Sequence, residues 1–355
     1  MTVATALRSP PVAASRPGKT QPFHLSEAWA RCWAEAYGSG RPVDVRAGDT
    51  RLRMERRVER RGPLRFPLLA SPTNLQTCYF DVEGEARAAE LDALPERLLA
   101  TGAPQVRIDW LTGDSPLLAA AAGWQGRHRT LVEFFALSPL VDCRDPFETY
   151  LARTGSTVRK VWKSCRRHVL NGPLDFAIVT GGPALQALLD EMFALEAAGW
   201  KGRAGDAILS NPQETHFYTA LAFAAAEAGA LRIATLREGA DLLAYEYCVV
   251  SAGTVLAMKV GYDEGRSRLQ PGHMAALLNI ADACADPAIA WYDMLGNSTR
   301  LAAYKRRFAT DYRKVYRLRL FSGSPSGRLL HAAYRLKPLA RAVRNRLRGL
   351  NAPSA

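Results

Sequence analysis

The chain has 355 residues, of which 48% are hydrophobic and 9% aromatic, and this is enough to bury the cores of two domains of ordinary size. Its apolar stretches are far shorter than the ~20 residues that a membrane-spanning helix requires, and prolines interrupt the N-terminus where a signal peptide needs an apolar core. These features exclude a disordered chain and an integral membrane protein, and we expect a cytoplasmic protein.

The net charge of +13 is unevenly distributed along the chain. Residues 328–355 contain seven basic residues and no acidic one, so more than half of the excess lies in the C-terminal tail. The mildly basic remainder argues against a nucleic-acid binder on charge alone. The six cysteines are far apart and form no C-x-x-C pair, which indicates neither a zinc site nor a disulfide framework.

The first half begins with residues 1–20, whose Ala, Ser, Pro and Thr content predicts a flexible leader. A helix is expected to start at Ser26, a suitable N-cap, and its apolar face comprises Trp29, Cys32, Trp33 and Ala36. Further strands and helices are predicted in the order β-β-β-α-β-α-β at 43–46, 51–58, 64–69, 91–100, 105–111, 116–122 and 129–137. Residues 138–146 are the predicted linker.

The second half begins with a predicted basic helix at 147–169. The elements after it have the order β-α-α-β-β-β-α-β-α-β and are predicted at 174–179, 183–198, 212–227, 231–236, 242–250, 254–262, 273–284, 289–295, 301–308 and 313–321. The stretch 106–111, followed by Gly113, resembles the stretch 289–295, followed by Gly296. This echo favours a duplication, although any α/β protein can yield one.

Several short features occur in the second half in a characteristic order: Gly199-Trp200-Lys201-Gly202-Arg203, which we expect to be a loop, Phe217-Tyr218, Val260-Gly261-Tyr262-Asp263, Pro271-Gly272, Asp293-Met294-Leu295-Gly296 and Tyr304-Lys305. Their order and spacing resemble the cellulose-biosynthesis branch of the GNAT acyltransferase superfamily, which is similar to the tandem-domain Fem aminoacyltransferases. The resemblance implies an α+β (α/β) protein with the GNAT fold in two tandem halves, at 21–145 and 146–322. A basic amphipathic tail at 323–355 follows them.

The resemblance also implies a site for acyl-CoA, most simply acetyl-CoA, whose pantetheine lies between two splayed parallel strands. Its pyrophosphate is expected at a helix N-terminus, because the first turn of a helix presents unpaired N–H donors and a partial positive charge. In this chain the position falls at Gln270, Pro271, Gly272 and His273. The superfamily signature is imperfect here, since Ala275 follows Gly272 by three positions. An ordinary Pro-Gly turn before a core helix is the alternative.

Acyl transfer to an amine requires a base for the ammonium proton and an acid for the departing thiolate. Asp293, near the end of a predicted central strand, is the leading candidate for the base, although a strand-end carboxylate can also be only a cap or turn former. Glu246 lies in an otherwise apolar strand and points either inward or to solvent. Tyr304 is the candidate acid, with a packed helix side chain as the alternative.

The residues predicted to contact the acceptor are Trp200, Lys201, Lys305, Arg159 and Lys163. Trp200 would stack on a sugar or base, and Lys305 would bind an anionic group. Arg159 and Lys163 lie along one side of the predicted basic helix and are expected to bind a sugar nucleotide, a lipid-linked phosphate or an RNA acceptor stem. A core tryptophan and solvated basic faces are the alternatives.

These features together predict an acyl-CoA-dependent N- or O-acyltransferase with a small-molecule or saccharide acceptor; the resemblance alone implies cell-envelope or exopolysaccharide assembly as its pathway. The alternatives are a Fem-like transferase that uses aminoacyl-tRNA and a catalytically silent GNAT-fold protein that binds a glycan or partner. The tail has apolar residues at helical spacing with arginines between them. It is expected either to lie on an anionic membrane surface, at the inner face of the membrane, or to dock on its own domain.

Overall fold

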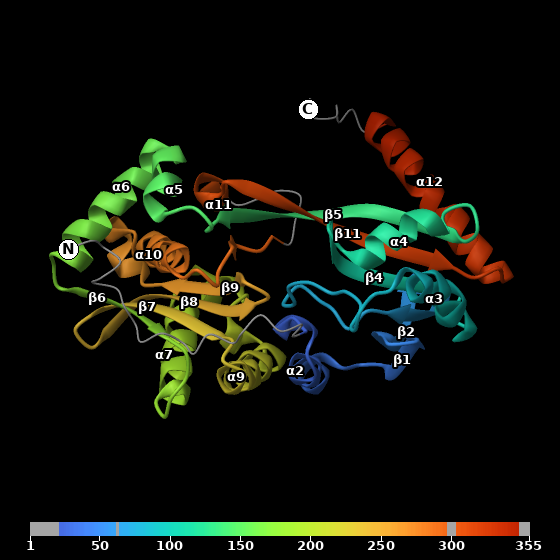
Figure 1. The fold of residues 1–355 in the computed structure, drawn as a ribbon, viewed down its shortest axis with the longest axis horizontal. Coiled ribbons are helices and arrows are strands. Elements are labelled where there is room, and N and C mark those ends of the chain that lie inside the picture. The colour runs from blue at the N-terminus through green and yellow to red at the C-terminus, as the bar shows by residue number, and fades with distance from the viewer. Residues whose placement is uncertain (1–20, 62–63, 297–302, 348–355) are drawn as a thin grey trace. The chain divides into compact units, whose positions relative to one another are not determined.

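The computed structural model describes residues 21–61, 64–296 and 303–347, and Figure 1 shows their elements. The chain divides into two compact units that interleave along the sequence. Unit 1 contains the described residues of 1–38, 74–79 and 135–315, and unit 2 contains those of 39–73, 80–134 and 316–355. No helix among the described residues combines the length and the apolar character needed to cross a membrane. The predicted leader lies outside the described residues, and the contiguous domain boundaries predicted from the sequence stay a prediction.

Unit 1 is built on a sheet with the strand order β6-β7-β8-β9-β10-β5. Strands β6 to β9 form an antiparallel meander, whereas β10 lies parallel to β9 and antiparallel to the end of β5. Gly239 and Gly253 in the two hairpin turns have φ values of 59° and 71°, which glycine adopts without steric cost. The strands are Leu174–Val179 (β6), Leu231–Glu238 (β7), Asp241–Ser251 (β8), Thr254–Tyr262 (β9), Trp291–Asp293 (β10), Arg129–Asp142 (β5) and Asp311–Phe321 (β11).

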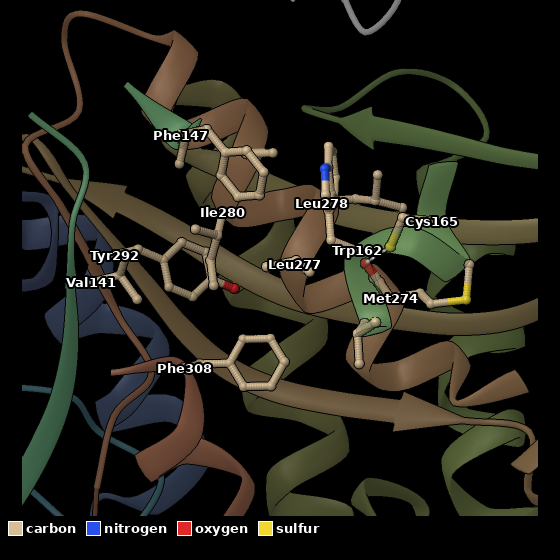
Figure 2. Close-up of a cluster of buried hydrophobic side chains, with 14 of the residues drawn as sticks. Val141, Phe147, Trp162, Cys165, Met274, Leu277, Leu278, Ile280, Tyr292 and Phe308 are labelled. Atoms are coloured by element: carbon tan, nitrogen blue, oxygen red, sulfur yellow. Dashed lines mark hydrogen bonds between the residues drawn. The ribbon is translucent and has the colours of Figure 1, made fainter. Parts of the chain in front are cut away.

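Helices cover both faces of this sheet (Figure 1). Helix α10 packs on one face, with α5 and α6 against it, and α7 and α9 pack on the other face, with α2 against α9. Because α10 is covered from both sides, almost all of its side chains are buried, and Figure 2 shows the apolar cluster around it. The helical segments are Phe23–Leu25 (η1), Glu27–Tyr37 (α2), Phe147–Arg153 (α5), Ser156–Cys165 (α6), Arg166–Leu170 (η2), Leu185–Ala198 (α7), Trp200–Ala204 (α8), Ile208–Ser210 (η3), Pro212–Glu227 (α9), Glu264–Leu269 (η4), Pro271–Ala285 (α10) and Ala303–Phe308 (α11).

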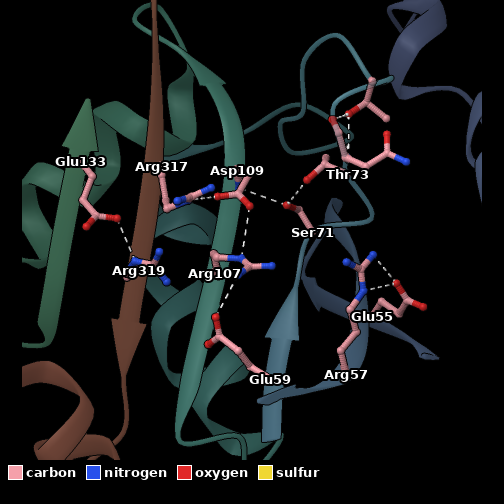
Figure 3. A network of polar contacts seen from close by, with 12 residues as sticks. Glu55, Arg57, Glu59, Ser71, Thr73, Arg107, Asp109, Glu133, Arg317 and Arg319 are labelled. Atoms are coloured by element: carbon pink, nitrogen blue, oxygen red, sulfur yellow. Dashed lines mark hydrogen bonds and ion pairs between the residues drawn. The ribbon is translucent and has the colours of Figure 1, made fainter. Parts of the chain in front are cut away.

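Unit 2 contains a second antiparallel meander, β1-β2-β3, and a strand β4 that lies parallel to β3. Ion pairs connect its strands (Figure 3): Arg107 lies 3.4 Å from Glu59, Arg319 lies 2.8 Å from Glu133, and Arg317 pairs with Asp109. The elements are Arg41–Ala47 (β1), Thr50–Arg61 (β2), Leu64–Ala70 (β3), Ala88–Ala100 (α3), Gln105–Thr112 (β4), Pro116–Trp124 (α4) and Pro325–Leu347 (α12).

The two units repeat one connection pattern. In unit 2 the chain runs β3-α3-β4-α4-β5, and in unit 1 it runs β9-α10-β10-α11-β11, with the two strands on either side of the first helix parallel in both cases. The sequence echo between residues 106–111 and 289–295 falls on β4 and β10, which hold the same place in the two patterns. The prediction of two tandem halves is therefore confirmed.

The structure also confirms the predicted first helix. Ser26 accepts a hydrogen bond from the amide of Trp29 at 3.2 Å and caps α2, whose buried residues are the four that the sequence places on its apolar face. Three other predictions were wrong. Residues 138–142 belong to β5 and not to a linker. The predicted basic helix breaks at Thr154 and Gly155, which are both extended. The predicted loop at 199–203 is helical from Trp200 onward.

Candidate functional site

The parallel strands β9 and β10 pair over only three residues, with Trp291, Tyr292 and Asp293 opposite Thr254, Val255 and Leu256. Strand β9 continues to Tyr262, so its last six residues have no partner in β10. The register between β9 and β8 also shifts here and leaves Met258 as an extra residue. A bulge of this kind bends a strand and increases its twist. The two strands therefore diverge beyond Leu256.

A cavity of about 480 Å³ lies beside the unpaired part of β9. Residues from seven elements (β8, β9, α7, α8, η4, α10 and α11) converge on it, an arrangement typical of ligand sites at the carboxyl ends of parallel strands. Its lining includes Glu246 of β8, Val260, Gly261 and Tyr262 of β9, Gln270 before α10, Gly272 and His273 of α10, Glu196 of α7, Trp200 and Lys201 of α8, and Tyr304 of α11.

Glu246 is the buried acid of this cavity. Its Oε2 atom accepts hydrogen bonds from the phenol of Tyr292 and, at 2.9 Å, from the amide of Asn279, whereas Oε1 has no partner among the described residues. No described lysine or arginine forms an ion pair with it. Burial raises the pKa of Glu246, and the two hydrogen bonds partly oppose that rise. The site therefore holds a fixed carboxylate with one oxygen free.

Tyr304 and His273 form the aromatic wall of the cavity. Their ring centroids are 5.8 Å apart, and His273 also lies 5.8 Å from the ring of Phe308. Burial, together with the negative charge of Glu246, raises the pKa of Tyr304, so its phenol stays protonated at neutral pH. Burial and the nearby Arg307 lower the pKa of His273, so its imidazole is neutral at the same pH.

The start of α10 presents an N-terminus without a side-chain cap to the cavity. Gln270, immediately before the helix, has left-handed backbone angles of φ 58° and ψ 48° and provides no side-chain cap. Pro271 has no amide hydrogen, and the amide of His273 bonds to the Gln270 carbonyl at 3.0 Å, so the amide of Gly272 is left without an acceptor among the described residues. A Cβ at Gly272 would lie 3.2 Å from the Tyr262 ring, so a side chain there would crowd the cavity. These groups fit one phosphate of a diphosphate.

Lys201 and Glu196 form a buried pair at the other side of the cavity. The Lys201 Nζ atom lies 2.6 Å from the Glu196 carboxylate and donates at 2.6 Å to the carbonyl of Val260, in the part of β9 that β10 leaves unpaired. The second oxygen of Glu196 accepts from the amide of Ile208 at 2.8 Å. Trp200 is 50% exposed, so it is not a core residue.

Asp293 and Lys305 lie beside this cavity, outside the residues that line it. The carboxylate of Asp293 is 0% exposed and accepts hydrogen bonds from Tyr79 at 2.6 Å, Arg313 at 2.8 Å and Ser138. Lys305 donates at 2.6 Å to the carbonyls of both Met294 and Leu295, which follow β10. Burial lowers the pKa of Lys305 to about 8.

Arg159 and Lys163 lie on α6 and do not line the cavity. Both side chains are exposed, and Arg159 donates to the carbonyl of Thr154 at the start of its own helix. The structure thus brings together most of the predicted site residues, with Pro271, Asp293, Lys305 and this pair outside the lining. The cavity is also lined by residues that were not predicted as site residues: Glu196, Tyr262, Glu264 and Ser267. For Glu196, its position five residues before Lys201 was the one feature of the sequence that could have indicated a place in the site.

Comparisons with known proteins relate part of this chain to a known family and its fold to solved structures. Residues 152–306 match the sequence profile of a family described as an acetyltransferase (GNAT) domain. The crystal structure of FemX matches 89% of this chain and 96% of its own, with a TM-score of 0.60 at 10% sequence identity. The chain has the GNAT fold.

Two further structures share this fold. A conserved protein of unknown function from Bacteroides thetaiotaomicron VPI-5482 matches 86% of this chain and 93% of its own at 11% identity, with a TM-score of 0.56. The C-terminal DUF2156 domain of a protein from Agrobacterium fabrum, assigned as a lysylphosphatidylglycerol synthetase, matches 88% and 95% at 13% identity, with a TM-score of 0.52. At these identities the likeness shows the fold alone. No curated protein sequence matches the chain.

Proposed function

We propose that unit 1 is an N-acyltransferase that moves an acyl group from acyl-CoA to an amine. The observation that carries this proposal is the free oxygen of Glu246, which lies in a cavity beside the gap between two diverging parallel strands of a GNAT fold. A buried carboxylate without an ion-pair partner attracts a cationic group. An ammonium acceptor provides that charge and the proton that a base must remove.

The donor site we propose extends from the unpaired part of β9 to the first turn of α10. Acyl-CoA supplies the activated thioester when it is bound. The Gly272 amide and the positive end of α10 would hold its pyrophosphate, and the exposed Arg268 in η4 adds a cation nearby. The Lys201–Val260 contact shows that the β9 backbone already presents a hydrogen-bonding group to the cavity.

The chemistry then follows from two side chains. Glu246 takes a proton from the acceptor ammonium, directly or through one water, so that its nitrogen can form the new C–N bond. The raised pKa of Glu246 makes its carboxylate a stronger base than an exposed one. Tyr304 gives its proton to the sulfur as the C–S bond breaks and takes the second proton that the new amide nitrogen loses, and its raised pKa keeps its own proton available at neutral pH. Tyr292 and Asn279 orient the base and do not react.

A thermal-shift measurement with acetyl-CoA tests the donor. A ligand at 100 times its Kd stabilises the native state by about 2.7 kcal/mol, so the melting temperature of the full chain should rise. Gly272→Glu places a negatively charged side chain against Tyr262 and should abolish this rise in melting temperature. The variant should still fold, because an acidic residue is favourable in the first turn of a helix. Gly323→Glu, where a Cβ meets open space, is the matched control. A shift that survives in Gly272→Glu would remove the proposed donor site.

A second candidate is a Fem-like transferase that uses aminoacyl-tRNA. The observation that favours it is the exposed basic surface of α6, where Arg159, Lys160 and Lys163 have no ion-pair partner among the described residues. Binding of charged tRNA that weakens steeply with salt, together with no response to acetyl-CoA, would select this candidate. Binding of a glycan with neither response would select a silent binding protein.

The acceptor and the pathway are further proposals. A saccharide amine in cell-envelope or exopolysaccharide assembly is suggested only by the sequence resemblance to the cellulose-biosynthesis branch. The first part of α12 docks on unit 2 through Leu330 and Tyr334, while Leu329 and Leu336, seven residues apart, are exposed. These exposed leucines support attachment of the tail to an anionic membrane surface, which sedimentation with anionic and neutral vesicles would test.

A further inference from the structure

A second cavity in unit 1, of about 590 Å³, is lined by four arginines. Arg144 follows β5, Arg153 ends α5, and Arg306 and Arg307 belong to α11, so segments far apart in sequence supply the positive charge. We call it the arginine cavity. None of its lining residues lines the cavity that contains Glu246. The proposed acyl transfer assigns no role to it.

Two of these arginines are held in place by neighbours. Arg144 makes a bidentate pair with Asp142, at 2.8 and 2.6 Å, and its guanidinium lies 4.6 Å from the centre of the Trp291 ring. Arg153 lies 2.8 Å from Asp145. Because their geometry is fixed before any ligand arrives, they lose little conformational freedom on binding one.

Arg306 and Arg307 are different, since neither has an acidic partner among the described residues. Asp142 and Asp311 are the acids in the lining, and Asp142 is already paired with Arg144. The arginine cavity therefore has an excess of positive charge. Guanidinium groups that converge on one space form paired hydrogen bonds with phosphate oxygens.

The start of α6 adds donors to the same cavity. Gly155 is the N-cap and Thr157 is in the first turn, and both line the cavity. No side chain caps this helix, its first turn has no acidic residue, and the Thr157 amide has no acceptor among the described residues. A helix start of this kind carries a partial positive charge. The start of α6 therefore adds to the positive charge of the four arginines, and it would not form a phosphate site without them.

We propose that the arginine cavity binds a phosphate group. The group is either the 3′-phosphate of a CoA donor or the phosphate ester of a separate ligand. The site does not depend on the proposed acyl transfer. Helix α11 connects the two cavities, because it carries Arg306 and Arg307 into the arginine cavity and Tyr304 into the cavity with Glu246.

The first experiment measures binding of inorganic pyrophosphate to the full chain by calorimetry. Arg306→Gln with Arg307→Gln removes two exposed charges and should weaken binding at least about tenfold, since each charged hydrogen bond contributes roughly 1.5–3 kcal/mol. Arg166→Gln with Arg167→Gln removes two adjacent exposed charges at the other end of α6 and should leave binding unchanged. Gly272→Glu removes the other turn proposed to hold a phosphate, so the pyrophosphate binding that remains in this variant is the part that the arginine substitutions should weaken.

The second experiment identifies the source of the phosphate. If the 3′-phosphate of CoA occupies the arginine cavity, the wild type should bind CoA more tightly than 3′-dephospho-CoA, and the Arg306/Arg307 variant should lose that preference. If the variant loses pyrophosphate binding but binds the two CoA forms as the wild type does, the phosphate belongs to a separate ligand. Pyrophosphate binding that is absent in the wild type, or equal in the variant and its control, would overturn the proposal.

Discussion

Arg313 of β11 donates a 2.8 Å hydrogen bond to the fully buried carboxylate of Asp293 at the end of β10. The equivalent aspartate in unit 2, Asp109 of β4, pairs with Arg317 of the same strand β11. Each unit thus joins the strand that lies parallel to its meander, β4 or β10, to β11 through one aspartate and one arginine. This repetition indicates that Asp293 stabilises the fold, whereas Glu246 offers a free oxygen to the cavity.

The substitution Asp293→Asn tests the structural role of this pair. It leaves Arg313 partly buried beside a neutral partner, and breaking a buried ion pair costs about 3–5 kcal/mol. We expect the free energy of unfolding to fall by about that amount, while turnover per folded molecule stays the same. Chemical denaturation measures the loss, with Asp175→Asn, an exposed acid of β6, as control. Loss of turnover in a folded Asp293→Asn variant would restore this residue as the base.

The substitution Glu246→Gln should have the opposite effect on stability. Burial raises the pKa of Glu246 above 4.5, so in the window above pH 4.5 the native state holds a proton that the unfolded state has lost. Stability contributed by this group is therefore lost as the pH rises. Glutamine removes that loss, and the variant should become increasingly more stable than the wild type as the pH rises above 4.5. A difference in stability that does not change with pH would show that burial does not raise the pKa of Glu246.

Lys305 has a pH dependence of the reverse sign. Its pKa is lowered from 10.5 to about 8, so between these values the unfolded state binds the proton and the native state does not. The stability of the wild type should rise with pH across that window. Lys305→Met should remove this rise, and Lys160→Met, an exposed lysine of α6, should keep it. Unfolding free energies of the three proteins, measured at several pH values between 8 and 10.5, give the comparison.

Tyr304→Phe tests the proposed acid. The phenol has no hydrogen-bond partner among the described residues, so its removal should cost little stability. Loss of a positioned acid lowers kcat by about 10²–10⁴-fold, and we expect that loss with an unchanged Kd for acetyl-CoA. Steady-state kinetics and calorimetry measure the two quantities. A variant that loses donor affinity but keeps kcat would make Tyr304 a binding residue only.

The sequence predicted the fold well where local patterns dominate. The apolar face of α2, the meander β7-β8-β9 and the bounds of α9 all follow from periodicity and turn residues that the surrounding structure does not override. The prediction was wrong where pairing between distant strands determines the length of an element. Strand β10 is only three residues long, because its length depends on where β9 bulges away, and that depends on pairing between β9 and β8.

The site was predicted in part for the same reason. Residues tied to a recognisable turn, such as Pro271 and Gly272, line or border the cavity that the structure shows. Asp293 was the leading candidate for the base because its position near the end of a strand can be predicted from the sequence. The hydrogen-bond partners that occupy the Asp293 carboxylate, and those that leave one oxygen of Glu246 free, come from distant parts of the chain and cannot be predicted in this way. No local pattern in the sequence predicts the arginine cavity, since its two pairs of arginines lie more than 150 residues apart in the chain.

The most direct test of the proposed function compares Glu246→Gln with Asp293→Asn in one assay. The measured quantity is the release of free CoA thiol from acetyl-CoA in the presence of a panel of primary amines, normalised to folded protein. The account predicts that the wild type and Asp293→Asn turn over alike, while Glu246→Gln loses about 10²–10⁴-fold in kcat and still binds acetyl-CoA. Turnover that survives in Glu246→Gln and is lost in Asp293→Asn would contradict it.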